Sequence, residues 1–99
     1  MAAPDVDIRS TAPATLAVTG ALVFDSAARA LKQAGELLKK SPHDTLDLAG
    51  VTTADSAGLA CVLAILATAR RQGGELRVAN MPASLKALAR VCEVEPLLV

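Results

Sequence analysis

The chain has 99 residues, of which 53% are hydrophobic and 1% aromatic, and its ten basic residues balance its ten acidic residues. This length and apolar content fit one small domain with a single packed core. The zero net charge and the single aromatic residue argue against partners that are nucleic acids or anionic lipids, so we expect no nucleic acid partner and no direct membrane insertion.

Residues 1–13 are expected to form a loose N-terminal tail, because two prolines and scattered charges interrupt any apolar pattern. This segment lacks the basic patch and apolar run of a signal peptide, which favours a cytoplasmic location. Residues 14–99 are expected to form a single domain. Its first strand is predicted at 15–19, where Leu16 and Val18 alternate with polar or small residues, and Gly20 is expected to interrupt it.

A first helix is predicted to begin near Asp25 or Ser26, either of which suits a helix cap, and to end before Pro42. Its apolar residues recur at spacings of three and four, which is typical of an amphipathic surface helix. These residues are Ala27, Ala30, Leu31, Ala34, Leu37 and Leu38. His43 follows in a loop, where we expect it to be solvated.

A second strand is predicted at 45–49, where Leu46 and Leu48 alternate with more polar residues. A turn is expected at 51–53. The next helix, from Ser56 to the glycines at 73–74, is polar only at its ends and should be the most deeply buried. Its uncharged stretch measures about 21 Å, less than the hydrocarbon core of about 30 Å, which predicts a buried helix and not a membrane span.

A third strand is predicted at 76–78, and a third helix is expected to begin at Pro82, where the missing N–H costs nothing. The apolar face of that helix contains Leu85, Leu88, Ala89 and Cys92. Both cysteines, at 61 and 92, lie in apolar helical patterns and are expected to be small core residues.

The alternation of strands and helices predicts crossover connections and a largely parallel sheet. Strands covered on both faces are apolar throughout, whereas these strands alternate, so we expect helices on one face and a more polar second face. The predicted fold class is therefore α/β, a small mixed or parallel sheet with helices packed mainly on one face.

No catalytic or metal-binding constellation is predicted. The single histidine, His43, has no activated serine or cysteine beside it in sequence, and the two cysteines do not form a CxxC pair. The glycines at 73–74 lie at a helix end and outside any phosphate-binding motif. We expect neither an enzyme nor a protein that binds a metal or a cofactor.

The turn TTADSAG, at 52–58, places hydroxyls and a carboxylate before the most apolar helix. Asp55 and Ser56 both suit a helix cap, so a structural role is one interpretation, and a functional surface is the other. Gly58 costs about 1 kcal/mol relative to alanine there, which indicates close approach of a partner or of a neighbouring loop. A phosphate on Ser56 would be tolerated at the helix start yet add about two negative charges, which makes Ser56 a candidate switch.

The segment TLDLAGVTTADSAGLACVLAILATARRQGGELRVANMP resembles the centre of a STAS domain. This family includes bacterial anti-sigma factor antagonists and the cytoplasmic parts of some anion transporters. The matching positions are Leu46-Asp47-Leu48, the signature turn Asp55-Ser56-Ala57-Gly58-Leu59, and the helix end from Arg70 to Gly74. The resemblance covers nearly all of residues 14–99 and implies a STAS-like sandwich.

Two branches of this family share the signature turn and imply different partners. In the MlaB-like branch, the residue that matches Ser56 lies on the surface that docks the ATPase of a phospholipid-moving ABC transporter. In the anti-sigma factor antagonists, the matching serine is phosphorylated by the partner kinase. The short chain, the helix rich in Ala and Leu, and the ending LKALARVCEVEPLL favour the MlaB-like branch. Ala60, where many antagonists have a second glycine, disfavours the phosphorylation interpretation.

The MlaB-like resemblance implies a non-catalytic subunit that supports phospholipid trafficking and the lipid asymmetry of the outer membrane. Its partner would be an ABC-transporter ATPase subunit of the MlaF kind and, indirectly, the permease, which would hold the chain at the inner membrane. The expected partner-binding residues are Thr53, Asp55, Ser56, Ala57 and Gly58.

The alternative is an anti-sigma factor antagonist controlled by phosphorylation of Ser56. A third interpretation, a ligand pocket within the apolar core, is disfavoured because the side chains are sized to fill that core.

Overall fold

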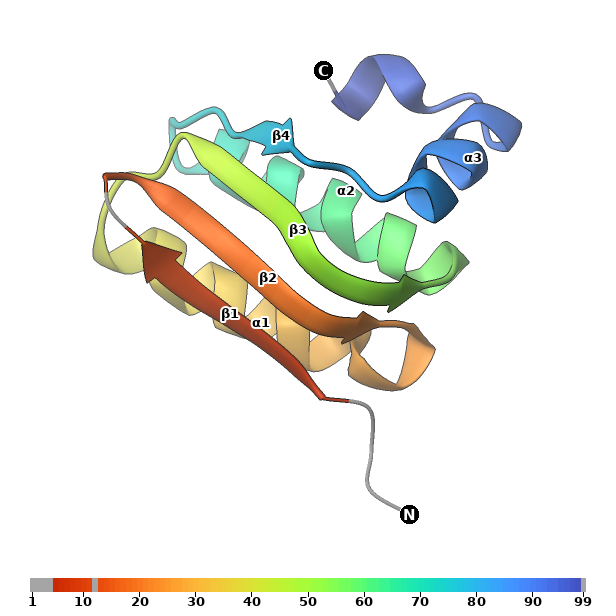
Figure 1. The fold of residues 1–99 in the computed structure, drawn as a ribbon. Helices are drawn as coiled ribbons and strands as arrows, with labels where there is room; N and C mark the ends of the chain where they lie inside the picture. Colours follow the sequence, from red (N-terminus) through yellow and green to blue (C-terminus); the bar gives the residue numbers. More distant parts are fainter. Residues whose placement is uncertain (1–4, 12, 99) are drawn as a thin grey trace.

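A four-stranded mixed sheet in the order β1-β2-β3-β4 forms the framework of the molecule (Figure 1). The structure is a computed structural model that describes residues 5–11 and 13–98. The strands are β1 (Val6–Thr11), β2 (Thr15–Leu22), β3 (Thr45–Ala54) and β4 (Arg77–Ala79). β1 runs antiparallel to β2, whereas β2 and β3, and β3 and β4, are parallel pairs.

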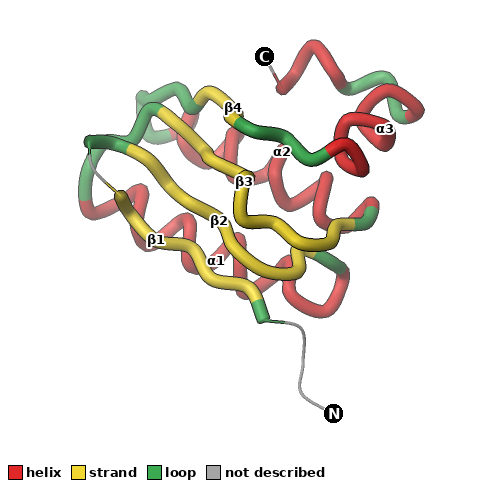
Figure 2. Tube along the Cα trace, viewed as in Figure 1, coloured by secondary structure: helices red, strands yellow, loops and turns green. Residues whose placement is uncertain are grey.

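Two long helices connect the parallel strands and lie on one face of the sheet, and two short helices follow β4 (Figure 2). They are α1 (Phe24–Lys40), α2 (Ser56–Arg71), α3 (Ala83–Val91) and the 3-10 helix η1 (Glu95–Leu98). Both the predicted mixed α/β fold and the predicted packing of α1 and α2 on one face are confirmed (Figure 1). Within the described residues, no helix is long and apolar enough to cross a membrane.

Alternation along the strands explains the one-sided packing. Leu16 of β2 pairs in register with Leu46 of β3, so the apolar rows of neighbouring strands align. Both side chains are fully buried, as is Leu48 farther along β3. The alternating residues point to the other face, where Ala17 of β2 is the register partner of Asp47 of β3. The predicted division into an apolar and a more polar face is confirmed.

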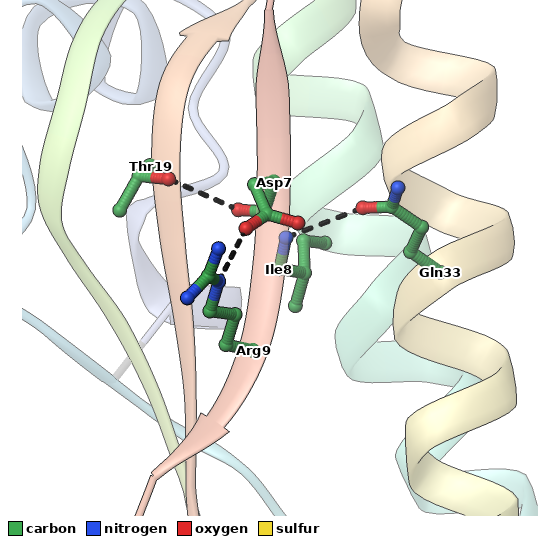
Figure 3. Close-up of polar contacts among 5 residues, drawn as sticks. All are labelled: Asp7, Ile8, Arg9, Thr19 and Gln33. Atoms are coloured by element: carbon green, nitrogen blue, oxygen red, sulfur yellow. Dashed lines mark hydrogen bonds and ion pairs between the residues drawn. The ribbon is translucent and has the colours of Figure 1, made fainter.

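The expected loose tail at residues 1–13 is wrong over residues 6–11, which form β1 along β2. Val6 and Ile8 are buried in the core, and the backbone N–H of Ile8 donates to Oε1 of Gln33 on α1 at 3.2 Å (Figure 3). Gln33 thus covers part of the outer edge of β1, where unpaired backbone groups would otherwise be exposed. Residues 1–4 and 12 of the expected tail lie outside the described residues.

Charged residues alternate with the apolar residues of β1 and obscured the strand in the sequence. Arg9 Nε lies 2.6 Å from Asp7 Oδ2 in an exposed ion pair, and the Thr19 hydroxyl of β2 lies 3.5 Å from the Asp7 carbonyl (Figure 3). A strand with one solvated face has this composition. The structural domain therefore begins earlier than residue 14.

β2 and β3 are longer than predicted. β2 continues past Gly20 to Leu22, and β3 continues through 51–53 to Ala54. Gly20 adopts a φ of +92°, and a Cβ there would overlap the carbonyl oxygen of Asp5. Gly20 therefore permits a strand irregularity and a close approach of the chain before β1, and it does not end the strand.

The predictions for His43 and Cys92 are wrong. His43 is buried: its Nδ1 donates to the Ser41 carbonyl at 2.9 Å, and its Nε2 lies 2.7 Å from the Ser10 hydroxyl. Because Ser10 belongs to β1, this burial depends on the strand that was not predicted. Cys92 is exposed at the end of α3, whereas Cys61 is buried as predicted.

Candidate functional site

The turn between β3 and α2 brings the predicted site residues to the start of α2. Asp55 is the N-cap, and its Oδ1 accepts the backbone N–H of Gly58 at 3.0 Å. The capping role expected for Asp55 is therefore confirmed. Ser56 is the first residue of the helix and is exposed, as is Thr53 near the end of β3, while Ala57 is half-buried.

The same carboxylate also caps a second helix. Oδ2 of Asp55 accepts the backbone N–H of Phe24, the first residue of α1, at 3.1 Å. Helix starts carry free N–H groups and a partial positive charge, so both favour an anionic acceptor. The N–H of Gly58 first, and that of Phe24 as well, hold the pKa of Asp55 below its usual value. Asp55 therefore joins the starts of α1 and α2 through a charged side chain.

Ser26 fixes the start of α1 from inside the helix, which corrects the expectation that it or Asp25 is the N-cap. The N-cap is Val23, whose N–H donates to the Ser26 hydroxyl oxygen at 3.0 Å. The Ser26 hydroxyl donates in turn to the Ala21 carbonyl at 2.6 Å and is fully buried. These bonds hold the chain between β2 and α1 in a fixed path.

The close approach predicted at Gly58 is confirmed, and the approaching backbone is the end of β2. A Cβ at Gly58 would overlap the carbonyl oxygen of Leu22. Gly58 is itself buried. Gly58 therefore lets α2 start against β2, and its expected role as a partner-binding residue stays a prediction.

Phe24 is bonded to this turn through its backbone, and the sequence interpretation did not single it out. It is the only aromatic residue of the chain, yet its side chain is 79% exposed at the start of α1. In the sequence Phe24 lies three residues before Ala27 and so continues the apolar repeat of the helix, which gave no sign of its exposure. Together with Asp25, Thr53, Asp55 and Ser56, it forms what we call the helix-start surface.

The carboxylate of the turn and the buried thiol of α2 are both held in structural hydrogen bonds. Both oxygens of Asp55 hold structural hydrogen bonds. The Cys61 thiol donates to the Ala27 carbonyl at 3.4 Å, and burial raises its pKa to about 11, which keeps it protonated and unreactive. Within residues 5–11 and 13–98, no cluster of three His, Cys, Asp or Glu side chains is placed to hold a metal ion.

Comparison with known proteins supplies the family and the fold. The family model described as "Mlab, STAS domain" matches residues 7–99. The structure of the anti-sigma factor antagonist SpoIIAA in its unphosphorylated form is similar, with a TM-score of 0.64, 12% identity, and coverage of 87% of this chain and 82% of that chain. No curated protein matches the chain in sequence.

A second solved structure, a candidate anti-sigma factor antagonist from Thermotoga maritima, has a TM-score of 0.73 and 15% identity. The match covers 94% of this chain and 82% of that one. At such identities the two likenesses demonstrate a shared fold. The family match begins inside β1, in agreement with a domain that includes this strand.

Proposed function

Because the chain belongs to the STAS domain family, through a family model described as MlaB, we propose that it is a non-catalytic subunit of an ABC transporter for phospholipid trafficking. It binds and supports the ATPase subunit, and through that subunit it is held at the membrane beside the permease. The observation that carries this proposal is the match over residues 7–99 to that family model.

The geometry of the helix-start surface supports this proposal. Ser56 is exposed at the start of α2, and the Asp55 carboxylate joins this helix to α1 with bonds of 3.0 and 3.1 Å. A surface held in place before binding loses little conformational entropy when a partner docks. Ser56, Thr53 and the exposed side of Ala57 are the proposed contacts, and Asp55 positions them.

An affinity purification tests the proposal directly. The tagged chain is isolated from its own host in mild detergent, and the co-purifying proteins are identified by mass spectrometry. We expect an ABC ATPase together with a membrane permease. A Ser56→Arg bait places bulk and charge on the proposed contact and should lose both proteins.

Ser41→Arg is the matched control for that bait. Ser41 is exposed at the opposite end of α1, and its carbonyl, which the substitution retains, is the group that bonds to His43. This bait should recover the same proteins as the unaltered chain. Recovery of the ATPase by both variants would show that the contact lies elsewhere on the molecule.

The exposed Ser56 hydroxyl also supports the alternative, an anti-sigma factor antagonist controlled by phosphorylation. In that case the purification should recover a soluble serine kinase, and the kinase with ATP should add phosphate to Ser56. Absence of phosphate on Ser56 under those conditions would reject the alternative.

A further inference from the structure

We propose that Phe24 is the anchor of the ATPase interface, inserting its ring into an apolar pocket of the ATPase subunit that is rimmed by lysine or arginine. This inference rests on the proposed function and deepens it, because it names a contact residue and the chemistry of the complementary site. The observation that carries it is the position of Phe24. Its side chain is exposed, and its backbone N–H donates to Asp55, the residue that precedes Ser56.

The exposure of Phe24 is not explained by the fold. The buried residues of α1 are Ser26, Ala30, Ala34 and Leu38, and Phe24 lies outside this row with 79% of its surface exposed. A large ring in water is unfavourable for an isolated domain, whereas aromatic side chains are enriched among the residues that dominate binding energy at interfaces. The chain places its one aromatic residue where its backbone N–H bonds to Asp55, the residue before Ser56.

The backbone of Phe24 is fixed before any partner arrives. Its N–H donates to Asp55 Oδ2 at 3.1 Å, and the preceding residue, Val23, donates its N–H to the buried Ser26 hydroxyl at 3.0 Å. A phenylalanine has only two side-chain torsions, so little conformational freedom remains to be lost on binding. Such preorganisation is what an interface anchor requires.

The charge around Phe24 indicates what kind of pocket it enters. Asp25 follows it and is exposed, and the Asp55 carboxylate bonds to its backbone. An exposed apolar ring with one acid next to it in the chain and another bonded to its backbone complements an apolar pocket with a positive rim, and complementary charge speeds association and disfavours wrong partners.

Among the residues that the structure describes, two other large apolar side chains are exposed, and they serve as controls. Val91 is 80% exposed at the end of α3, and Leu97 is 56% exposed in η1. α3 packs on α2 and β3, whereas α1 packs on α2, β1 and β2, so the two ends belong to different parts of the molecule (Figure 1). Val91→Ala removes apolar surface of comparable exposure without altering the helix-start surface.

The test measures binding affinity. The ATPase–permease complex is prepared without this chain, solubilised in detergent, and titrated with the purified chain or one of its variants. Phe24→Ala keeps the backbone N–H that bonds to Asp55, so its melting temperature should equal that of the unaltered chain. We expect Phe24→Ala to weaken binding at least about tenfold and Val91→Ala to change it less than about twofold. Asp25→Asn should weaken binding at low salt and reduce its dependence on salt.

The outcomes separate this inference from the function on which it rests. If Ser56→Arg abolishes binding while Phe24→Ala binds like the unaltered chain, the anchor is wrong and the transporter function stands. Equal losses for Phe24→Ala and Val91→Ala would also overturn it, since the effect would not be specific to the helix-start surface. If the unaltered chain does not bind the complex, both proposals are wrong.

Discussion

The Asp55 carboxylate accepts the backbone N–H of Phe24 at 3.1 Å, although the two residues lie 31 positions apart in the sequence. Because Asp55 also caps its own helix at Gly58, one side chain connects the first turns of α1 and α2. This carboxylate, together with the packing of α1 on α2, therefore sets the position of Ser56 relative to α1. Stability of the fold and shape of the proposed docking surface are coupled at this residue.

Removal of this carboxylate should destabilise the protein. Asp55→Ala leaves the N–H groups of Gly58 and Phe24 without their acceptor, and we expect the free energy of unfolding to fall by about 1–2 kcal/mol, as for other lost N-caps. Chemical denaturation at pH 7 measures the difference. Asp25→Ala is the control, because Asp25 is an exposed acid in the first turn of α1, and it should cost less than Asp55→Ala.

The effect of Asp55 should also depend on pH. Hydrogen bonds to the carboxylate lower its pKa in the folded state, so its stabilisation is complete above the unfolded value of about 3.9 and is lost as the pH falls through the folded value. The difference between the unaltered chain and Asp55→Ala should be constant from about pH 7 to pH 5 and shrink below about pH 4. A difference that persists or grows at lower pH would contradict this assignment.

Gly58 and Gly35 should respond to alanine in opposite directions. A Cβ at Gly58 overlaps the Leu22 carbonyl oxygen, a backbone atom that cannot move cheaply, so Gly58→Ala should cost about 3 kcal/mol or more or prevent folding. Gly35 lies within α1, where a Cβ would meet no atom within 4 Å, so Gly35→Ala should stabilise by about 0.5–1 kcal/mol. Thermal unfolding of both variants checks the contrast. A tolerated Gly58→Ala would mean that α2 does not start against β2.

Sequence periodicity predicted the elements whose signals come from residues close together in the chain. The apolar repeat of α1, its end before Pro42 and the end of α2 before Gly73 are local features, and the structure confirms them. β1 was missed because only Val6 and Ile8 carry its apolar signal, and its pairing with β2 is a tertiary contact. The burial of His43 was missed for the same reason, since it depends on Ser10.

The sequence indicated where the candidate site lies, but it did not indicate which hydrogen bonds hold the site together. The polar turn before an apolar helix identified Asp55 and Ser56, and the cost of glycine indicated a close approach at Gly58. No local pattern reveals that the second Asp55 oxygen reaches Phe24, because that bond requires the starts of two helices to meet.

Asn80, the residue after β4, allows the contributions of its backbone conformation and of its side-chain hydrogen bond to be tested separately. It adopts a φ of +56°, and its Nδ2 donates to Asp47 Oδ1 at 3.0 Å, which is the largest cause of the lowered pKa of Asp47. Asn80→Ala loses the bond and strains the left-handed backbone, so we expect a cost of about 1–2 kcal/mol in unfolding free energy. Asn80→Gly loses the bond alone and should cost less. Equal costs in urea denaturation would show that the backbone conformation contributes nothing.

The two cysteines should differ in reactivity towards a thiol reagent. Burial raises the pKa of Cys61 to about 11, while Cys92 is exposed at the end of α3. We expect one thiol per chain to react with an aromatic disulfide reagent at pH 8, and a second to react only after denaturation. Cys92→Ser should abolish the reaction of the folded protein. Rapid labelling of Cys61 in that variant would contradict the packing of α2 against α1.

The most direct test of the proposed function is to learn what Ser56 touches in the cell. A photoreactive amino acid is placed at position 56 or, as a control, at the exposed position 41, and the illuminated cells are analysed for cross-linked partners. We expect a cross-link from position 56 to the ATPase subunit of an ABC transporter and none from position 41. A cross-link from position 56 to a soluble serine kinase, or to the ATPase from position 41 alone, would contradict the proposed function.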